Sequence, residues 1–304
     1  MHPKLRALQT QLQPAPLVHI NCPELQHYGV ELWLKREDLI HPIISGNKWR
    51  KLKYILQDAL DNDADSLISM GGAWSNHLHA LAYTGAMLGL QTTAFIRGER
   101  PPQLSPSLQD MLTWGMRLDF VSRQDFQQLR QYKDWNSLPN HSNTAYWIPE
   151  GGSSALALAG VGELVEEIAL AYDYLVVPCG TGTTLAGLLQ RAPAQATVLG
   201  FAALKNSGFL EAEVCALLNG TIPAAPWQIN SSYHFGGFAK TSLELHQFMS
   251  KFEALTAIAL EPIYTSKMLF GVYELVRQGY FKRGERIIAI HTGGLQGRRT
   301  LHGS

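Results

Sequence analysis

Short apolar runs alternate with stretches of helical periodicity along most of the chain. The runs at 65–70, 91–96 and 174–177 are typical of buried strands, whereas apolar residues recur at helical spacing within 76–88 and 156–171. Such regular alternation predicts an α/β protein with parallel sheets and helices on their faces. By the same criteria, further strands are expected at 31–35, 117–121, 145–148, 197–202 and 286–291, and further helices at 104–114, 124–132 and 266–278.

Composition and charge narrow the class of protein. Polar, proline-containing segments at 136–143 and 223–227 are expected to be loops, and 304 residues suffice for one large domain or two smaller ones. The 25 basic and 25 acidic residues balance, which argues against nucleic acid or an anionic membrane as a partner. Three scattered cysteines form no metal spacing, and no apolar run resembles a signal peptide or membrane span. We therefore expect a cytoplasmic protein without a metal.

The turn at Ser45–Leu52 (SGNKWRKL) follows a predicted strand and opens a predicted helix. Ser45 and Asn47 are good capping residues, and they place Lys48 near the start of that helix. A lysine amine shielded from water loses part of its proton affinity and can attack a carbonyl to form a Schiff base. The same residues also fit a capped surface helix with a basic face, because four of the six positions 48–53 are lysine or arginine.

Two later strand-to-helix turns suit anions. Gly71–His77 (GGAWSNH) passes through two glycines to Ser75 at a helix start, where free amides and the helix dipole favour a carboxylate; an ordinary capped helix is the alternative. Cys179–Thr184 (CGTGTT) combines glycines with consecutive hydroxyls, which favours a phosphate cup over a tight turn with a threonine cap. This turn lacks the lysine of a Walker A loop and the glycine spacing of a dinucleotide site.

The last predicted strand ends at Ile290–Gly294 (IHTGG), which is also polar. We expect His291 either to be structural or to support a neighbouring residue of the site, and Thr292 could face a bound ring. A lysine, a carboxylate seat, a phosphate cup and this polar strand end together suggest pyridoxal phosphate, a phosphorylated aldehyde that withdraws electrons from a substrate carbon.

Seven motifs, in one order and spread over nearly the whole chain, resemble a single family. It is the fold-type II pyridoxal-phosphate-dependent family of 1-aminocyclopropane-1-carboxylate deaminase and D-cysteine desulfhydrase. The resemblance implies two domains, each with a mainly parallel twisted sheet flanked by helices, with the cofactor between them. It implies a large cofactor-binding domain of residues 1–49 and 156–304, a smaller inserted domain of residues 50–155, and a homodimer. The motifs are Lys35–Leu39, Ser45–Leu52, Gly71–His77, Pro149–Gly152, Gly180–Thr184, Glu261–Lys267 and His291–Gly294.

The resemblance also implies roles for individual residues in cofactor binding. Lys48 resembles the lysine that forms the Schiff base, and Asn76 resembles the partner of the ring's phenolic oxygen. The residues that match the family's phosphate cup are Thr181, Gly182, Thr183 and Thr184.

Substrate contacts follow in the same way. Ser75, Asn76 and His77 look like the seat of the substrate carboxylate, with Ser75 also near the reacting atoms. Tyr264 matches the active-site tyrosine of the Pro-x-Tyr motif, and Tyr233 matches a second, substrate-facing tyrosine in a looser context. With Lys48 and Ser75, these two tyrosines form the implied catalytic set. A buried core tyrosine is the alternative for each of them.

Two departures from the family bear on the substrate. The deaminases carry a glutamate after the Pro-x-Tyr tyrosine, where it can keep the ring nitrogen protonated, whereas this chain has Thr265 as the desulfhydrases do. Thr292 also looks like the desulfhydrase arrangement, and a neutral hydroxyl gives a weaker electron sink that suffices when thiolate leaves. The second departure is Leu295–Thr300 (LQGRRT), which replaces a small apolar and proline-containing run. Its Arg298 and Arg299 either form a solvated tail or alter the rim of the pocket, and with it the preferred substrate.

The leading hypothesis is therefore a lyase that converts D-cysteine, or a related D-amino acid, to pyruvate, sulfide and ammonia. The sister hypothesis is deamination of 1-aminocyclopropane-1-carboxylate to 2-oxobutanoate, against which Thr265 argues. A hypothesis from another class is a non-catalytic protein that holds pyridoxal phosphate or an amino acid. A nicotinamide-binding protein is a remote fourth, because its glycine spacing fails.

Overall fold

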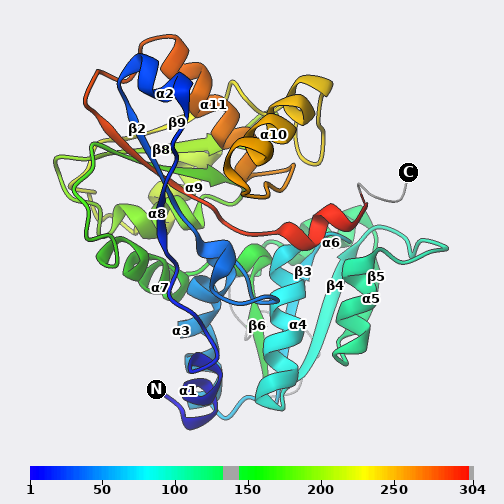
Figure 1. The fold of residues 1–304 in the computed structure, drawn as a ribbon. Coiled ribbons are helices and arrows are strands. Elements are labelled where there is room, and N and C mark those ends of the chain that lie inside the picture. Colours follow the sequence, from blue (N-terminus) through cyan, green and yellow to red (C-terminus); the bar gives the residue numbers. More distant parts are fainter. Residues whose placement is uncertain (133–143, 301–304) are drawn as a thin grey trace.

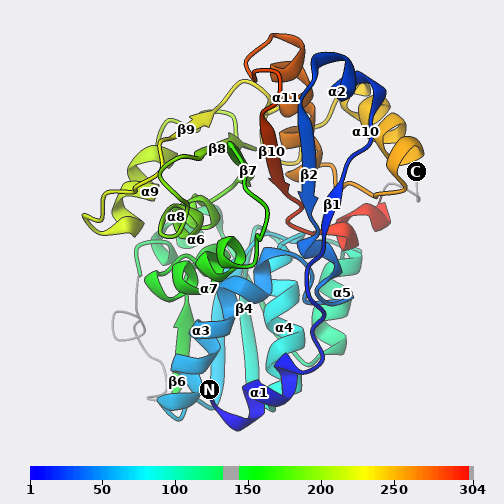
Figure 2. The same cartoon turned by 60° about the vertical axis from the view of Figure 1, so that its left-hand side comes forward.

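Two sheets, each with helices on both faces, make up the molecule in a computed structural model (Figures 1 and 2). The structure describes residues 1–132 and 144–300, so the expected loop at 136–143 lies outside the described residues. Both sheets are built mainly from parallel strands, as the alternation of the sequence predicts. No helix formed by the described residues combines the length and the apolar character needed to span a membrane.

The larger sheet has six strands, all parallel except the edge strand β1, which pairs antiparallel to β2. Side chains alternate between its faces: Ile287 and Ala289 point to one core, and Ile288 and Ile290 point to the other. Helices α2 (Pro23–Tyr28), α10 (Leu243–Thr256) and α11 (Thr265–Arg277) cover the first face, and α7 (Ala155–Glu166), α8 (Thr183–Leu189) and α9 (Leu210–Leu218) cover the second. In spatial order the strands are β1 (Leu17–His19), β2 (Glu31–Lys35), β10 (Arg286–Ile290), β7 (Tyr174–Cys179), β8 (Thr197–Ala202) and β9 (Trp227–Asn230).

The smaller sheet has four parallel strands. Helices α3 (Asn47–Asp61), α4 (Asn76–Leu88) and α5 (Pro106–Thr113) contribute to the core on one face, and α6 (Arg123–Leu129) covers the other. Short 3₁₀ turns η1 (Glu37–Leu39), η3 (Glu150–Gly152) and η4 (Leu295–Thr300) complete the chain. In spatial order the strands are β5 (Arg117–Val121), β4 (Gln91–Arg97), β3 (Ser66–Gly71) and β6 (Ala145–Ile148).

The N-terminal helix α1 (Pro3–Gln9) departs from the predicted division into domains. Leu5 and Leu8 are buried in the same core cluster as Leu67 of the smaller sheet, and α1 lies beside α3 and α4 in both views (Figures 1 and 2). Assigning all of residues 1–49 to the large domain is therefore wrong for α1. The other domain boundaries remain a prediction.

Sequence periodicity predicted the parallel strands better than the peripheral elements. The expected helix at 156–171 ends at Glu166, and the expected loop at 223–227 runs into the start of β9. The short elements α1, β1, α2 and α9, and the longer α10, have weak hydrophobic periodicity and were not predicted. Short segments receive much of their stability from tertiary packing, which local periodicity does not encode.

Candidate active site

Lys48 lies in the first turn of α3, where the backbone of the chain is tightly packed. The N-cap is Gly46 rather than Ser45 or Asn47, so the expected capping is wrong. Gly46 has φ 70°, and a Cβ there would lie 1.8 Å from the carbonyl oxygen of Thr292, so only glycine fits. This contact fixes the start of α3 against the end of strand β10.

The four turns singled out in the sequence meet at one place. Asn47 accepts a hydrogen bond from Lys48 Nζ (2.9 Å) and donates one to Thr184 Oγ1 (2.8 Å), which joins the lysine turn to the threonine turn. Gly294, at the end of the last turn, lies so close to Asn76 that a Cβ there would be 2.6 Å from the amide nitrogen. The chemistry-bearing motifs are therefore one site at the carboxyl ends of strands, where α/β sheets bind their ligands.

The threonine turn presents a cluster of hydroxyl groups at the start of α8. Thr181 Oγ1 and Thr183 Oγ1 are 2.8 Å apart, and Thr183 donates to Ser153 Oγ (3.0 Å), which follows η3. Gly182 is the N-cap of α8, with φ 74°. Because glycine has no side chain, no side-chain hydrogen bond caps this helix. Sequence reasoning missed Ser153, which lies just past the Pro149–Gly152 motif.

Lys48 sits in an environment that favours its neutral form. Burial lowers the pKa of its amine to about 8, although the charge of Glu261 partly opposes the shift. Glu261 is itself buried, and its pKa is raised to about 7 by burial although the backbone N–H groups of Ile263, Tyr264 and Thr265 donate to it. A lysine with such a pKa holds a substantial neutral fraction near pH 8, as a nucleophile or a base requires.

The alternative of an exposed basic face on α3 is wrong, because Arg50, Lys51 and Lys53 are all buried. Arg50 forms bidentate ion pairs with Glu37 and Glu167, and Lys53 pairs with Glu163 at 2.7 Å. These pairs tie α3 to α7 and η1.

Lys51 is the exception on α3. It is 4% exposed, and its amine makes no hydrogen bond or ion pair with any residue among 1–132 and 144–300. Burial and the neighbouring charge of Lys48 hold its pKa well below the ordinary lysine value, and the Cys179 thiol at the threonine turn acts weakly in the other direction. A buried amine without a counter-charge is costly unless an anion binds beside it. Sequence reasoning missed this residue because its spacing resembles that of a surface lysine.

The start of α4 offers donors to an anion mainly through its backbone. Ser75 is the N-cap, and its hydroxyl accepts from the N–H of Leu78 (3.2 Å), which leaves the hydroxyl hydrogen free to donate. The next N–H groups, those of Asn76 and His77, belong to the first turn, where amides have no partner within the helix. The predicted carboxylate seat is thus compatible with the local geometry.

The His77 side chain contributes an acceptor rather than a positive charge. Ser69 donates its hydroxyl hydrogen to the carbonyl of Ile148 (2.7 Å), so the contact of 2.9 Å between Ser69 Oγ and His77 Nε2 requires a proton on Nε2. Nδ1 is then an acceptor, and it has no partner among the described residues. Burial, with the charges of Lys48 and Lys51, lowers the pKa of His77 to about 3. A carboxylate here would be held by amides, not by an imidazolium.

The two predicted tyrosines differ in position. Tyr264 is the N-cap of α11, and its ring packs on the backbone of Gly180, where a Cβ would be 3.2 Å away. Burial raises the pKa of Tyr264 well above the usual range. The ring of Phe238 meets it edge-on at 6.0 Å, and Phe238 is half-exposed, so it covers one side of Tyr264. Sequence reasoning did not assign Phe238.

Tyr233 does not join the site. Its hydroxyl accepts from Gln278, which follows α11 at the end opposite to Tyr264, roughly 20 Å along the helix. Its ring packs against Phe201 and Phe270 in the core beneath the larger sheet. The predicted catalytic role of Tyr233 is therefore wrong, and the alternative of a core tyrosine fits its surroundings.

Thr265 and Thr292 bring two uncharged hydroxyl groups together at the ends of their segments. Thr265 is fully buried, and its hydroxyl oxygen lies 3.4 Å from that of Thr292. His291 bonds Ala259 O through Nε2 (2.8 Å) and accepts from the N–H of Gly293 through Nδ1, so it is structural, as its position suggested. The two hydroxyls offer hydrogen bonds without charge.

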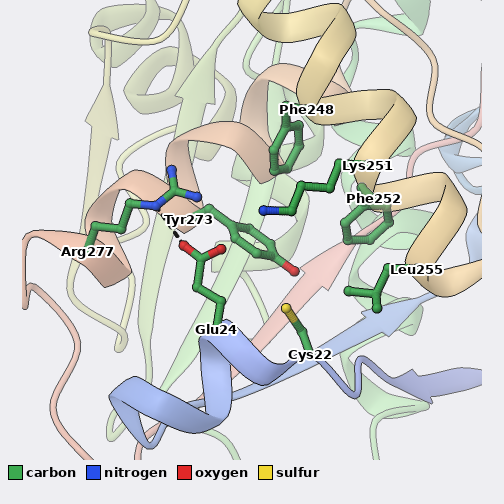
Figure 3. A pocket seen from close by; sticks show the side chains of 8 residues that line it. All are labelled: Cys22, Glu24, Phe248, Lys251, Phe252, Leu255, Tyr273 and Arg277. Carbon is green, nitrogen blue, oxygen red and sulfur yellow. Dashed lines mark hydrogen bonds and ion pairs between the residues drawn. The ribbon is translucent and has the colours of Figure 1, made fainter.

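A pocket lies on the outer helices of the larger sheet (Figure 3). The Tyr273 hydroxyl is buried there, beside the Cys22 side chain. Tyr273 and Arg277 belong to the half of α11 remote from Tyr264, so this pocket is separate from the lysine site.

Comparison with known proteins agrees with this geometry. The profile of the family described as "Pyridoxal-phosphate dependent enzyme" matches residues 8–293. The chain belongs to this family. The chain is also 31% identical to a putative 1-aminocyclopropane-1-carboxylate deaminase of Pyrococcus horikoshii, over 99% of this chain and 97% of that protein. It is 30% identical to a bifunctional D-cysteine desulfhydrase/1-aminocyclopropane-1-carboxylate deaminase of Arabidopsis thaliana, over 93% and 77% respectively.

A solved structure of a 1-aminocyclopropane-1-carboxylate deaminase homologue superposes with a TM-score of 0.78 at 28% identity, covering 98% of this chain and 97% of that chain. The predicted two-sheet architecture of pyridoxal-phosphate-dependent enzymes of fold type II is thereby confirmed. The residues of this member of the family also fit the cofactor. The unpaired amine of Lys51 lies near the threonine turn, where hydroxyls and amides can surround a phosphate, and a phosphate bound there would favour its protonated form. The lowered pKa of the Lys48 amine suits attack on an aldehyde.

Proposed function

We propose that this pyridoxal-phosphate-dependent enzyme is a lyase that acts on D-cysteine or a related D-amino acid. D-Cysteine and water would give pyruvate, hydrogen sulfide and ammonia, with cleavage of the Cβ–S bond. The observation that carries the proposal is the neutral pair of Thr265 and Thr292, where a carboxylate would strengthen the electron sink. A weaker sink suffices when a good leaving group departs from Cβ. The name of the Arabidopsis relative includes this activity and supports the assignment.

Five groups would hold the cofactor. We expect Lys48 to bond its aldehyde carbon, Asn76 to contact its phenolic oxygen, and the Thr265–Thr292 pair to face its ring nitrogen. The phosphate would lie against Lys51 and the cup formed by Thr181, Gly182, Thr183 and Thr184. When bound, pyridoxal phosphate supplies an electron sink for the substrate Cα.

The remaining groups would bind the substrate and move protons. The N–H groups of Asn76 and His77 would hold the substrate carboxylate, and the free hydroxyl hydrogen of Ser75 would donate to it or to the leaving group. Once released from the cofactor, Lys48 is the base whose lowered pKa suits removal of the Cα proton. The raised pKa of Tyr264 keeps its phenol protonated, so its hydroxyl can donate a hydrogen bond to the departing sulfur.

The test is a product assay on the purified protein with added pyridoxal phosphate. D-Cysteine should release pyruvate and sulfide in equal amounts, and L-cysteine should react more slowly. A panel of D- and L-amino acids that releases no 2-oxo acid from any member would overturn the proposal, and would leave the alternative of a protein that binds the cofactor or an amino acid without turnover.

A second candidate is deamination of 1-aminocyclopropane-1-carboxylate to 2-oxobutanoate and ammonia, which the names of both relatives favour. Thr265 argues against it, because opening the ring needs the stronger sink. Thr265→Glu should raise 2-oxobutanoate release if the ring-nitrogen partner decides between the reactions. The nearby Glu261 already accepts from the Thr265 N–H, so a glutamate at 265 would add like charge, and Thr265→Ser is the matched control.

We further propose that the enzyme acts as a homodimer in the cytoplasm, with a small amino acid as its substrate. The three cysteines are free thiols, which suits a reducing compartment. Light scattering on the purified protein tests the dimer: a mass near 67 kDa, twice the chain mass of 33.7 kDa, is expected, and a monomer would contradict it.

A further inference from the structure

The segment after the HTGG motif forms a bridge between the two units of the molecule. In both views η4 lies between the helices of the larger sheet and those of the smaller one (Figures 1 and 2). Arg298 donates two hydrogen bonds to Glu253 of α10 (2.6 and 3.0 Å), on the larger sheet. Arg299 makes a bidentate pair with Asp110 of α5, on the smaller one.

Both ends of this bridge are anchored further. Glu253 also accepts from the backbone N–H of Leu260 (2.9 Å), directly before Glu261. Asp110 also accepts from His79 Nε2 of α4 (2.9 Å), three residues past Asn76. Bidentate arginine–carboxylate pairs fix orientation as well as distance, so η4 has a defined position over the start of α4.

Gln296 lies inside this bridge and reaches the site. Its Nε2 donates to Asn76 Oδ1 at 2.7 Å, and its backbone carbonyl oxygen accepts from Arg299 Nε at 3.1 Å. A primary amide can turn by 180° about its last bond with little change in shape, so a fixed partner for its oxygen decides which way its NH₂ points. With Oδ1 occupied by Gln296, the NH₂ of Asn76 is the group left to donate elsewhere.

We propose that Gln296 is a positioning residue that fixes the side-chain amide of Asn76, so that its NH₂ faces the phenolic oxygen of the cofactor. This inference rests on the proposed role of Asn76 as a contact of that oxygen. Arg298 and Arg299 hold Gln296 in place by joining α10 to α5. The unusual LQGRRT segment therefore contributes to cofactor binding through Asn76, rather than serving as a solvated tail.

Gln296→Glu is the decisive variant, because it keeps the shape of the side chain and replaces the donor by an acceptor. The Asn76 amide would then lie between two acceptors, the new carboxylate at position 296 and the phenolic oxygen of the cofactor. It should turn its NH₂ toward the carboxylate and its oxygen toward the cofactor. We expect the cofactor to bind about 5- to 10-fold more weakly and its visible absorption maximum to shift, because one hydrogen bond to a polar partner is lost. Gln296→Met removes both the NH₂ donor and the carbonyl acceptor of the side-chain amide but keeps its volume, so it should have a smaller effect.

A double-mutant cycle separates positioning from packing. If Gln296 acts through Asn76, then Gln296→Glu should change neither the affinity nor the spectrum once Asn76→Ala is present. Full additivity of the two substitutions would overturn the proposal, as would a Gln296→Glu protein within twofold of wild type in both readouts. These measurements need no substrate, so they stand apart from failure of the proposed reaction.

The two arginines provide a second test with a matched control. Arg298→Gln and Arg299→Gln should each weaken cofactor binding about twofold, because each leaves the other end of the bridge attached. Arg277→Gln breaks a comparable pair, with Glu24 at 2.6 Å, that joins α11 to α2 away from η4. It should leave cofactor binding unchanged. Equal effects of all three variants would mean that any lost ion pair loosens the protein, and would contradict a specific role for the bridge.

Discussion

The four basic residues in the first two turns of α3 fall into two pairs with opposite surroundings. Arg50 and Lys53 point to α7 and η1, where carboxylates of the protein neutralise both of them. Lys48 and Lys51 point to the cluster of turns, where Lys48 contacts only an amide and Lys51 has no partner among the described residues. The first two turns of α3 thus carry two basic side chains that carboxylates of the protein neutralise, and two that have no carboxylate partner.

The contrast distinguishes structural charge from functional charge. A buried ion pair that is complete within the protein is retained for geometry, and breaking it is costly. A buried amine that the protein does not neutralise is costly as it stands, and the cost disappears when an anion or a carbonyl carbon binds. Each of the following predictions changes one of the basic residues of α3.

The largest effect is expected at Lys48. Lys48→Ala should lower product release at least about a thousandfold, because both the bond to the cofactor and the base are lost. Borohydride should fix the cofactor to the wild type and not to this variant. Lys267 is the matched control: burial lowers the pKa of its amine to about 8 as well, but it donates to the carbonyls of His234 and Gly237. Fixation that persists in Lys48→Ala and fails in Lys267→Met would refute the assignment.

Loss of a structural charge should show in stability instead. Arg50→Met leaves the fully buried Glu37 without its partner, so we expect the free energy of unfolding to fall by about 3–5 kcal/mol. Urea denaturation of the cofactor-free protein measures this. If Arg50→Met proves as stable as the wild type, the α3–α7 pairs are not the structural charges described here.

Lys51→Met should have the opposite signature. Removing an unpaired buried amine should leave the cofactor-free protein equally stable or more stable, while cofactor binding weakens about 10- to 100-fold through loss of a charge-assisted hydrogen bond to phosphate. Titration with pyridoxal phosphate, beside denaturation of the same samples, gives both numbers. A variant that is destabilised but binds the cofactor normally would place Lys51 with Arg50 as structural.

The smallest effect, taken per unit of pH, is a pH dependence of stability. The pKa of Lys48 is lowered to about 8 in the folded protein, from 10.5 for an ordinary lysine. Between these values the unfolded chain binds more protons, so this group makes the cofactor-free protein more stable as the pH rises from about 8 to 10.5, by at most about 1.4 kcal/mol per pH unit. Lys48→Met should therefore exceed the wild type in stability below pH 8, and the margin should vanish near pH 10.5. A margin independent of pH would show that Lys48 is not desolvated.

Much of the site was predictable because its chemistry is local. The turn sequences around Lys48, Ser75, Thr183 and Thr292 lie at the ends of predicted parallel strands, and such ends share one edge of a sheet. What could not be predicted depends on contacts across the molecule. A loose motif match predicted that Tyr233 belongs to the site, but its ring packs beside Phe270 in the core.

The sequence by itself determined the alternation of strands and helices, the order of the turns and the position of Lys48 at the start of a helix after one of them. These features follow from periodicity and from residue types within a few positions of one another. Only the tertiary structure decided that Arg50 and Lys53 are buried in ion pairs, that Lys51 lacks one, and that Gln296 reaches Asn76. Each of these results depends on which distant segment packs against the residue. The sequence around a charged side chain does not show whether that side chain will contact water, a carboxylate of the protein or a ligand.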